Sequence, residues 1–377
     1  MRRRVMRSKD SPLVPTLRLD GVERADRPLR ILLLSQYFPP EVGATQSRMQ
    51  AFAEYLAARG HRVTVICEFP NHPHGVVPAE YRGRLYEDDR SNPYRVLRVW
   101  VKASEEKTQR TRMAFYLSYM ALATAMAPVA GRADVVVATT PPLFTGAAGL
   151  ALAKLNRAPF VLDVRDLWPS AAVSLDQIPS TWAIRASEAL ERLLYRRASA
   201  VTAVTKPFCL HIDAIRQREP RPVLVPNGTL DLFFDDADPG DARERLGARD
   251  GRPLVTFAGT LGIAQALPTV LEAAQLSDDL DWALLGDGPV KETLRRKATA
   301  HGQANVLFHP QVPLESVPGF LAASDVLLVR VVRIEAISPS DGNSSVSSDQ
   351  RSDSSSEAPP PAVAARMYSW IASEKAW

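Results

Sequence analysis

The chain has 377 residues, enough for two domains that each bury a hydrophobic core. Its composition is globular, and its net charge of +4 suits a phosphate-rich ligand or an anionic membrane surface. No cluster of aromatic and basic residues indicates a nucleic-acid partner. Residues 1–28 are basic but lack the apolar segment of a secretory signal, so we expect a disordered tail. Cys67 and Cys209 lie in apolar contexts, which predicts reduced core residues of a cytoplasmic protein.

Residues 30–67 predict a strand, a loop, a helix and a second strand. Ile31–Leu34 and Val63–Cys67 are continuous apolar runs, as in strands buried on both faces of a parallel sheet. Between them one apolar helix face recurs at helical spacing, formed by Met49, Phe52, Ala53 and Leu56. The loop QYFPPEVGAT therefore lies at the carboxyl end of the first strand, where open α/β sheets bind ligands.

Gly43 in this loop lets the backbone approach a ligand, and the amides near Thr45 form a helix N-terminus that favours an anion. A tight structural turn is the alternative interpretation. Neither G-x-G-x-x-G nor G-x-x-x-x-G-K occurs here, which argues against an NAD enzyme and an ATPase. In the long loop that follows, His72 and His74 lack further ligands at metal spacing, so we expect no metal.

Residues 113–130 are apolar and follow several basic residues, among them Lys102, Arg110 and Arg112. Three interpretations stay open: a buried core helix, a helix at the membrane interface, or a membrane span. Ser118, Thr124 and Pro128 weaken the span. An interfacial helix would place its basic flank on anionic lipid.

The next elements alternate between strands at 135–138, 160–164 and 200–204 and helices at 143–156 and 180–197. The last helix is expected to point Trp182, Leu190, Leu193 and Leu194 inward. The strand at 160–164 ends in DVRDLWPS, so Asp163, Arg165 and Asp166 are crowded where a parallel strand meets its loop. Solvated loop charges or a helix cap are the alternative to a functional site.

The same alternation begins again at Pro253 after an Asp/Gly/Arg-rich stretch, 229–252, which predicts a linker. FAGTLGIAQAL and LLGDGP each place glycines directly after a buried strand. The chain is therefore expected to contain two tandem, doubly wound Rossmann-like α/β domains, at 29–228 and 253–330. Residues 331–362 are Ser-rich and cannot bury a core, and 363–377 predict a short helix.

In order and spacing, several stretches resemble the GT-B glycosyltransferases of family 4, near the L-fucosaminyltransferase-like subgroup of O-antigen synthesis. They are QYFPPEVGA, FPNHPHGVVPAEYRGRL, TTPPLFTG, VLDVRDLWP, VTAVTKPF, VPNG, FAGTLGIAQAL, LLGDGP and ASDVLLV. The resemblance covers residues 30–330. It implies retaining transfer of a sugar from a UDP- or GDP-type nucleotide sugar to a lipid-linked or saccharide acceptor, without a metal or other cofactor. It also implies a cytoplasmic enzyme, peripheral on the inner face of the plasma membrane.

The resemblance also implies roles for individual residues. Gly43 and Ala44 would lie near the diphosphate or the transferred sugar, and Asp163, Arg165 and Asp166 near the acceptor. The donor would be bound by Gly259, Thr260, Leu261, Gly262, Gly286, Asp287, Gly288 and Arg366.

The sequence departs from this family after ASDVLLV. A Ser-rich segment intervenes, and AARMYSWIASEK then resembles a degraded copy of the motif that normally follows, with Arg366 at the usual Lys. We therefore expect an incomplete second domain in a truncated or frame-disrupted product. An inactive remnant or binding subunit is the alternative to an active enzyme.

Overall fold

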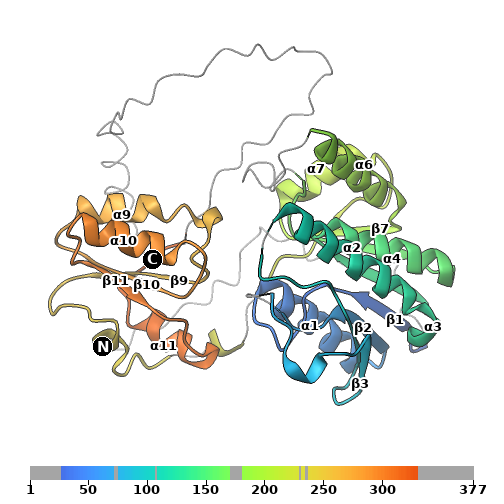
Figure 1. The fold of residues 1–377 in the computed structure, drawn as a ribbon, viewed down its shortest axis with the longest axis horizontal. Helices are drawn as coiled ribbons and strands as arrows, with labels where there is room; N and C mark the ends of the chain where they lie inside the picture. The colour runs from blue at the N-terminus through green and yellow to red at the C-terminus, as the bar shows by residue number, and fades with distance from the viewer. Residues whose placement is uncertain are drawn as a thin grey trace, which may run out of the picture. The chain divides into compact units, whose positions relative to one another are not determined.

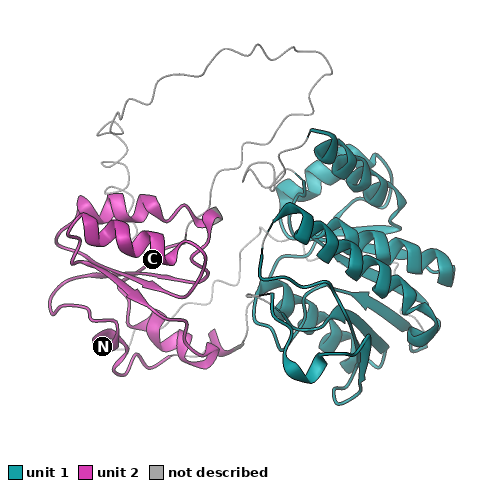
Figure 2. Cartoon of the chain, viewed as in Figure 1, with its two compact units in different colours: residues 1–169, 178–227 teal, residues 170–177, 228–377 magenta. Residues whose placement is uncertain are grey.

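The computed structural model describes residues 27–71, 75–106, 108–169, 181–228, 231–233 and 237–329. The chain divides into two compact units, which are coloured separately in Figure 2. Unit 1 comprises residues 1–169 and 178–227, and unit 2 comprises residues 170–177 and 228–377. The predicted Ser-rich segment, the terminal helix and Arg366 lie outside the described residues.

Unit 1 is built on an eight-stranded sheet with the order β3-β4-β2-β1-β5-β6-β7-β8 (Figure 1). Its strands are β1 Arg30–Leu34, β2 Arg62–Glu68, β3 Tyr86–Asp89, β4 Arg95–Val99, β5 Val135–Thr140, β6 Phe160–Val164, β7 Ala200–Ala203 and β8 Val223–Leu224. All neighbours pair in parallel except β3, which runs antiparallel to β4. The chain leaves β1 toward β2 and leaves β5 toward β6, so the order reverses between β1 and β5.

Helices cover both faces of this sheet. They are α1 Ala44–Ala58, α2 Gln109–Ala125, α3 Ala127–Ala130, α4 Leu143–Asn156, α6 Thr181–Arg197 and α7 Lys206–Arg216. Alternate residues of β1 serve the two faces: Ile31 and Leu33 pack with α1, whereas Leu32 and Leu34 pack in the core beneath the other helices. Met49 and Ala53 are fully buried, which confirms the predicted inner face of α1.

Two predictions about the helices of unit 1 need correction. Trp182 and Leu193 are 74% and 43% exposed, so of the four predicted residues only Leu194 and, in part, Leu190 turn toward the core from α6. The apolar stretch 113–130 is two helices, α2 and α3, and Pro128 lies in the first turn of the second. Only Tyr119 and Ala123 of α2 are buried. Within the described residues, no helix is long and apolar enough to cross a bilayer.

Unit 2 contains a parallel four-stranded sheet with the order β11-β10-β9-β12. Its strands are β9 Leu254–Ala258, β10 Asp281–Leu285, β11 Val306–His309 and β12 Val326–Leu327. Its helices are α8 Ala242–Arg245, α9 Pro268–Gln275, α10 Lys291–Ala300 and α11 Val317–Ala322. Residues predicted as linker contribute here, because Ala242 and Leu246 are buried in a core cluster with Leu254 and Phe320.

Candidate active site

In unit 1, the loops that follow β1 and β5 leave the sheet at the point where the strand order reverses. Open α/β sheets bind ligands in the crevice at such a point. The loop after β1 runs from Ser35 to Gly43, and the segment after β5 contains Pro141 and Pro142. The predicted residues at 163–166 come from the end of the adjacent strand β6 and from the loop that follows it.

Arg165 connects three elements at this edge of the sheet. Its Nε donates to Thr139 Oγ1 at 2.8 Å, its Nη2 donates to the Pro141 carbonyl at 2.6 Å, and its Nη1 donates to Thr45 Oγ1 on α1. Burial lowers the pKa of Arg165 to about 10, so the guanidinium remains charged at neutral pH. A guanidinium has five N–H donors. Among the described residues three are used, which leaves two for a ligand.

Asp163 is fully buried and lies in a polar network rather than at a surface. Arg48 of α1 binds both of its oxygens, with Nε to Oδ2 at 3.1 Å and Nη2 to Oδ1 at 2.8 Å. Thr139 and Thr202 donate to the same two oxygens at 3.1 Å and 2.7 Å. Because its acceptor positions are occupied, Asp163 is placed to hold Arg48 and the strand ends in position.

Asp166, the residue after Arg165, is half-buried. Its Oδ1 accepts from the Leu167 amide at 2.9 Å, and burial raises the pKa of its carboxyl group. Tyr195 of α6 has a pKa raised by burial, by Glu191 and, to a smaller extent, by Asp166. The carboxylate of Asp166 therefore lies within electrostatic range of α6 as well as of Arg165.

The N-terminus of α1 supports the predicted anion position. Gly43 precedes the helix without a side-chain cap, and its carbonyl accepts from Ser47 at 3.0 Å. The amides of the first turn therefore have no acceptor within the helix. No acidic residue occurs in this turn, and Ala44 is exposed. The φ of Gly43 is 169°, an extended value, so the backbone conformation does not itself require glycine.

In unit 2 the two glycine-bearing loops pack against each other through their backbones. A Cβ on Gly286 would lie 2.0 Å from the Gly259 carbonyl oxygen, and a Cβ on Gly288 would lie 2.4 Å from the Leu261 oxygen. The Leu261 amide donates to the Asp287 carbonyl at 2.9 Å. The Leu261 side chain is buried in the core. Thr260 and Asp287 are exposed, and Gly262 is half-exposed beside Gln265.

The side-chain roles of three residues in these networks were missed in the sequence. Arg48 was detectable, because it is a lone charge next to the apolar residues Met49 and Phe52 on a helix that covers a sheet. Thr45 carried no signal beyond its place at a helix start. Lys291, whose Nζ donates to the carbonyls of Gly286 and His309 at 2.8 and 2.9 Å, looked like an ordinary surface lysine of α10.

Residues 43–228 match the family model described as "Glycosyl transferase 4-like domain". The chain is 25% identical over 312 residues to the putative colanic acid biosynthesis glycosyl transferase WcaI of Escherichia coli, covering 80% of this chain and 76% of that protein. Residues 43–228 therefore form a glycosyl transferase 4-like domain, and the two matches together support a family 4 glycosyltransferase.

Solved structures show that this chain has the GT-B fold. Sucrose-phosphate synthase from Thermosynechococcus elongatus matches with a TM-score of 0.61 at 17% identity, over 79% of this chain and 74% of that one. Anabaena HepE, solved in complex with UDP and glucose, matches with a TM-score of 0.54 at 19% identity, over 79% and 73%. The prediction of a two-domain GT-B glycosyltransferase is confirmed.

Proposed function

We propose that this chain transfers a sugar, with retention of configuration, from a UDP- or GDP-type nucleotide sugar to a lipid-linked or saccharide acceptor. The reaction would serve the synthesis of a cell-envelope polysaccharide such as an O-antigen. The observation that carries the proposal is the convergence of the charged Arg165 and the open N-terminus of α1 at the strand-order reversal of unit 1. The colanic acid assignment of WcaI and the UDP bound to HepE support the same reaction class.

The chemistry of glycosyl transfer suits these groups. As the bond between the sugar and the diphosphate breaks, negative charge develops on the leaving diphosphate. Fixed amide dipoles and a cation stabilise such charge without reorganisation. We assign this role to the α1 amides near Gly43 and Ala44 and to Arg165. Asp163 and Arg48 are positioning residues, because their polar groups are occupied by each other and by neighbouring strands.

The acceptor hydroxyl must lose a proton, and Asp166 is the proposed partner for it. Its pKa is raised by burial, which favours proton uptake by a carboxylate. In unit 2 the exposed parts of the loops at 259–262 and 286–288 would bind the nucleotide, with their backbones held in place by mutual packing. Arg366, proposed to act with them, lies outside the described residues.

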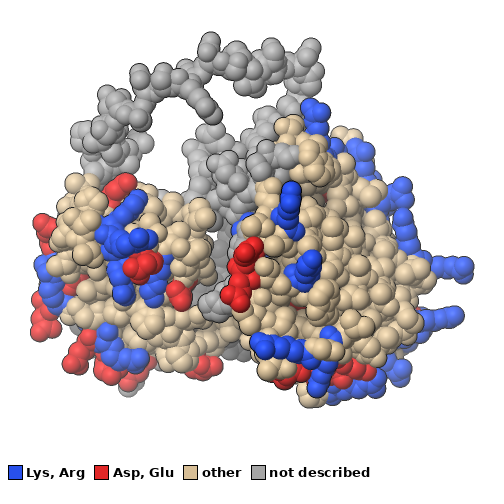
Figure 3. All heavy atoms as spheres, in the orientation of Figure 1, with Lys and Arg blue, Asp and Glu red and all other residues tan. Residues whose placement is uncertain are grey.

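We further propose peripheral binding to the inner face of the plasma membrane through the helices of unit 1. Met113 and Leu117 are exposed one turn apart on α2, and Lys102 and Arg110 are exposed near its start. In Figure 3, basic side chains stand over a broad uncharged surface on the visible face of unit 1, and acidic ones gather at its margins. Apolar side chains beside basic ones are typical of interfacial helices.

The test of function is release of UDP or GDP from the nucleotide sugars by the full chain, with and without bacterial lipid-linked saccharides. Arg165→Gln should lower the turnover number about 100-fold, the size of losing one donor to a developing anion. Arg62→Gln, an exposed arginine of the same unit, is the control and should match the parent. If the folded chain releases no nucleotide from any UDP- or GDP-sugar, the proposed reaction is wrong and the binding-subunit alternative replaces it.

A further inference from the structure

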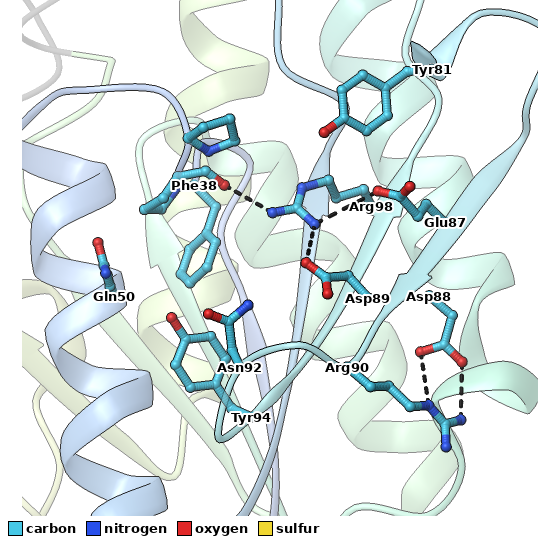
Figure 4. Close-up of a pocket in the computed structure, with 12 residues that line it drawn as sticks. Phe38, Gln50, Tyr81, Glu87, Asp88, Asp89, Arg90, Asn92, Tyr94 and Arg98 are labelled. Carbon is cyan, nitrogen blue, oxygen red and sulfur yellow. Dashed lines mark hydrogen bonds and ion pairs between the residues drawn. The ribbon is translucent and has the colours of Figure 1, made fainter.

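An open hollow of about 630 Å³ lies in unit 1 between α1, the Pro39–Pro40 segment and the β3–β4 hairpin (Figure 4). Its volume falls in the range of small-molecule sites. None of the residues assigned above to donor, acceptor or catalysis lines it. In Figure 4, Gln50 of α1 stands on one side, Arg98 and Asp89 stand on the other, and Asn92 and Tyr94 lie between them.

The charges around this hollow do not suit an anion. It is lined by Glu87, Asp88 and Asp89 and by two guanidinium groups, those of Arg90 and Arg98, so the lining carries one net negative charge. Both guanidinium groups are engaged. Arg98 contacts Asp89 Oδ2 at 3.0 Å and the Pro39 carbonyl at 3.1 Å, and Arg90 contacts Asp88 Oδ2 at 3.0 Å. A phosphate or diphosphate would meet a lining of net negative charge whose guanidinium groups are already paired with carboxylates, which is unfavourable.

Neutral hydrogen-bonding groups supply the remaining contacts. Gln50 and Asn92 each carry an amide with donors and an acceptor, and both are accessible at the rim. Burial raises the pKa of the Tyr81 and Tyr94 phenols, so both hydroxyls stay protonated and can donate. Tyr94 also packs edge-to-face on Phe38, with ring centroids 6.1 Å apart.

Mixed donors and acceptors beside aromatic rings complement a polyhydroxylated ring. Each sugar hydroxyl both donates and accepts, and its C–H faces can pack on aromatic surface. Asp89 adds a fixed acceptor, because hydrogen bonds from the Ser91 hydroxyl and amide, and then from Arg98, lower the pKa of its carboxyl group. The lining therefore favours a neutral saccharide unit over a nucleotide or a lipid phosphate.

The hollow and the candidate active site share one loop and one helix, the segment after β1 and α1. Arg98 holds the carbonyl of Pro39, and the same loop continues to Gly43 and the start of α1. Gln50 lies six residues after Ala44, about 9 Å along the helix at 1.5 Å per residue. The Gln50 side of the hollow and the α1 N-terminus are therefore about 9 Å apart along the helix axis.

We propose that this hollow is an acceptor subsite, which binds a neutral sugar unit of the acceptor other than the one that receives the transferred sugar. The inference rests on the proposed glycosyl transfer and adds the class of acceptor, a saccharide longer than one unit. It also assigns the choice among acceptor saccharides to Gln50, Asn92 and Tyr81, which lie away from the reacting atoms.

The test uses the full chain and neutral oligosaccharides released by mild acid from bacterial exopolysaccharide, with binding followed by saturation-transfer NMR. The double variant Gln50→Ala/Asn92→Ala should weaken binding at least tenfold while leaving nucleotide release from the donor into water unchanged. Tyr55→Ala removes an exposed tyrosine further along α1, outside the hollow, and should bind as the parent does.

Equal binding by the parent and the double variant would overturn the subsite, as would no binding of these oligosaccharides by the parent. Either result leaves the proposed reaction standing as long as the parent releases nucleotide from its donor. If the parent chain binds saccharide but releases no nucleotide from its donor, the proposed reaction is refuted and the saccharide site stands.

Discussion

The two units shape the loops at the ends of their strands by different means. In unit 1 charged side chains do so: Arg48 and Asp163 form a buried pair, and Arg165 joins α1 to β5. In unit 2 the backbone does so, since Gly286 and Gly288 lie against the carbonyls of Gly259 and Leu261. The difference teaches where each unit is vulnerable. Unit 1 depends on charge being matched, and unit 2 depends on the absence of a Cβ.

The largest effect on stability is expected from Asp163→Asn. The change leaves the buried Arg48 without a full counter-charge, which costs about 3–5 kcal/mol in comparable pairs. Urea unfolding followed by circular dichroism measures it. Asp88→Asn, which weakens half-exposed pairs with Arg90 and Arg95, should cost about 1 kcal/mol or less. Similar losses of stability in both variants would show that the buried pair contributes no more than the half-exposed pairs.

Gly286→Ala tests the corresponding weakness of unit 2. Its Cβ would clash with the Gly259 carbonyl at a φ of +144°, and we expect a loss of about 3 kcal/mol. Gly302→Ala is the matched control: its φ is +64°, but nothing lies within 4 Å of the place its Cβ would take, so only backbone strain of about 1 kcal/mol remains. Hydrogen exchange should localise the loss to residues 254–329. Equal costs at both glycines would remove the case for close loop packing.

Asp166→Asn tests the proposed proton acceptor without disturbing the buried network. Turnover should fall about 100-fold, within the range for general base catalysis, while the unfolding midpoint stays within error. Because burial raises the pKa of Asp166, the parent should lose activity as pH falls through that raised value. The variant should lack this acid limb. Glu188→Gln, which changes a half-exposed carboxylate of α6, should keep it. An acid limb that persists in Asp166→Asn would exclude this residue as the base.

The pH dependence of stability should also distinguish the units. Burial raises the pKa of Glu191 in unit 1 to about 7, although a hydrogen bond from Tyr195 opposes the shift. The folded state then holds a proton that the unfolded state releases from about pH 4.5 upward. This contribution to stability is therefore lost as pH rises from 4.5 to 7.

In unit 2 the buried Asp281 behaves oppositely. Burial would raise its pKa, but Arg249 and Arg252 together lower it, so its contribution is lost only in acid.

Relative to the parent, the free energy of unfolding of Glu191→Gln should therefore rise by about 2 kcal/mol between pH 4.5 and pH 8, with little difference at the acid end. Denaturant unfolding at several pH values measures this gain. A gain that is the same at every pH would mean that the Glu191 carboxyl titrates normally in the folded chain.

The smallest effect concerns the surface. Met113→Ser/Leu117→Ser should lower binding to anionic liposomes about tenfold, since both exposed side chains leave the interface. Binding of the parent should also fall at high salt. Leu276→Ser changes a 71% exposed leucine of unit 2 and should leave flotation unchanged. A parent that does not float at low salt would contradict the membrane proposal.

Buried strands were the most predictable part of the fold. The segments 160–164 and 143–156 were placed at their observed bounds, because apolar runs and helical spacing report burial directly. Strand β3 was missed, since Tyr86–Asp89 is acidic and its carboxylates find Arg95 and Arg98 only after folding. Likewise, the loop DVRDLWP was identified as a candidate site, but its division between buried Asp163, bridging Arg165 and half-buried Asp166 depends on partners from distant elements.

The reach of Arg48 has a consequence for how the chain is made. Besides Asp163, its guanidinium donates to the carbonyls of Val225 and Pro226 and to the Asn227 side chain, partners 177 to 179 residues downstream. A ribosome that adds about 5–20 residues per second needs roughly 10–35 s to deliver them. For the later part of that interval β1, α1 and β2 have already been synthesised, with an arginine whose final partners do not yet exist. The hydrogen bonds of Arg48 are therefore complete only when VPNG, which follows the last strand of unit 1, has been synthesised, whereas its counter-charge Asp163 is available earlier.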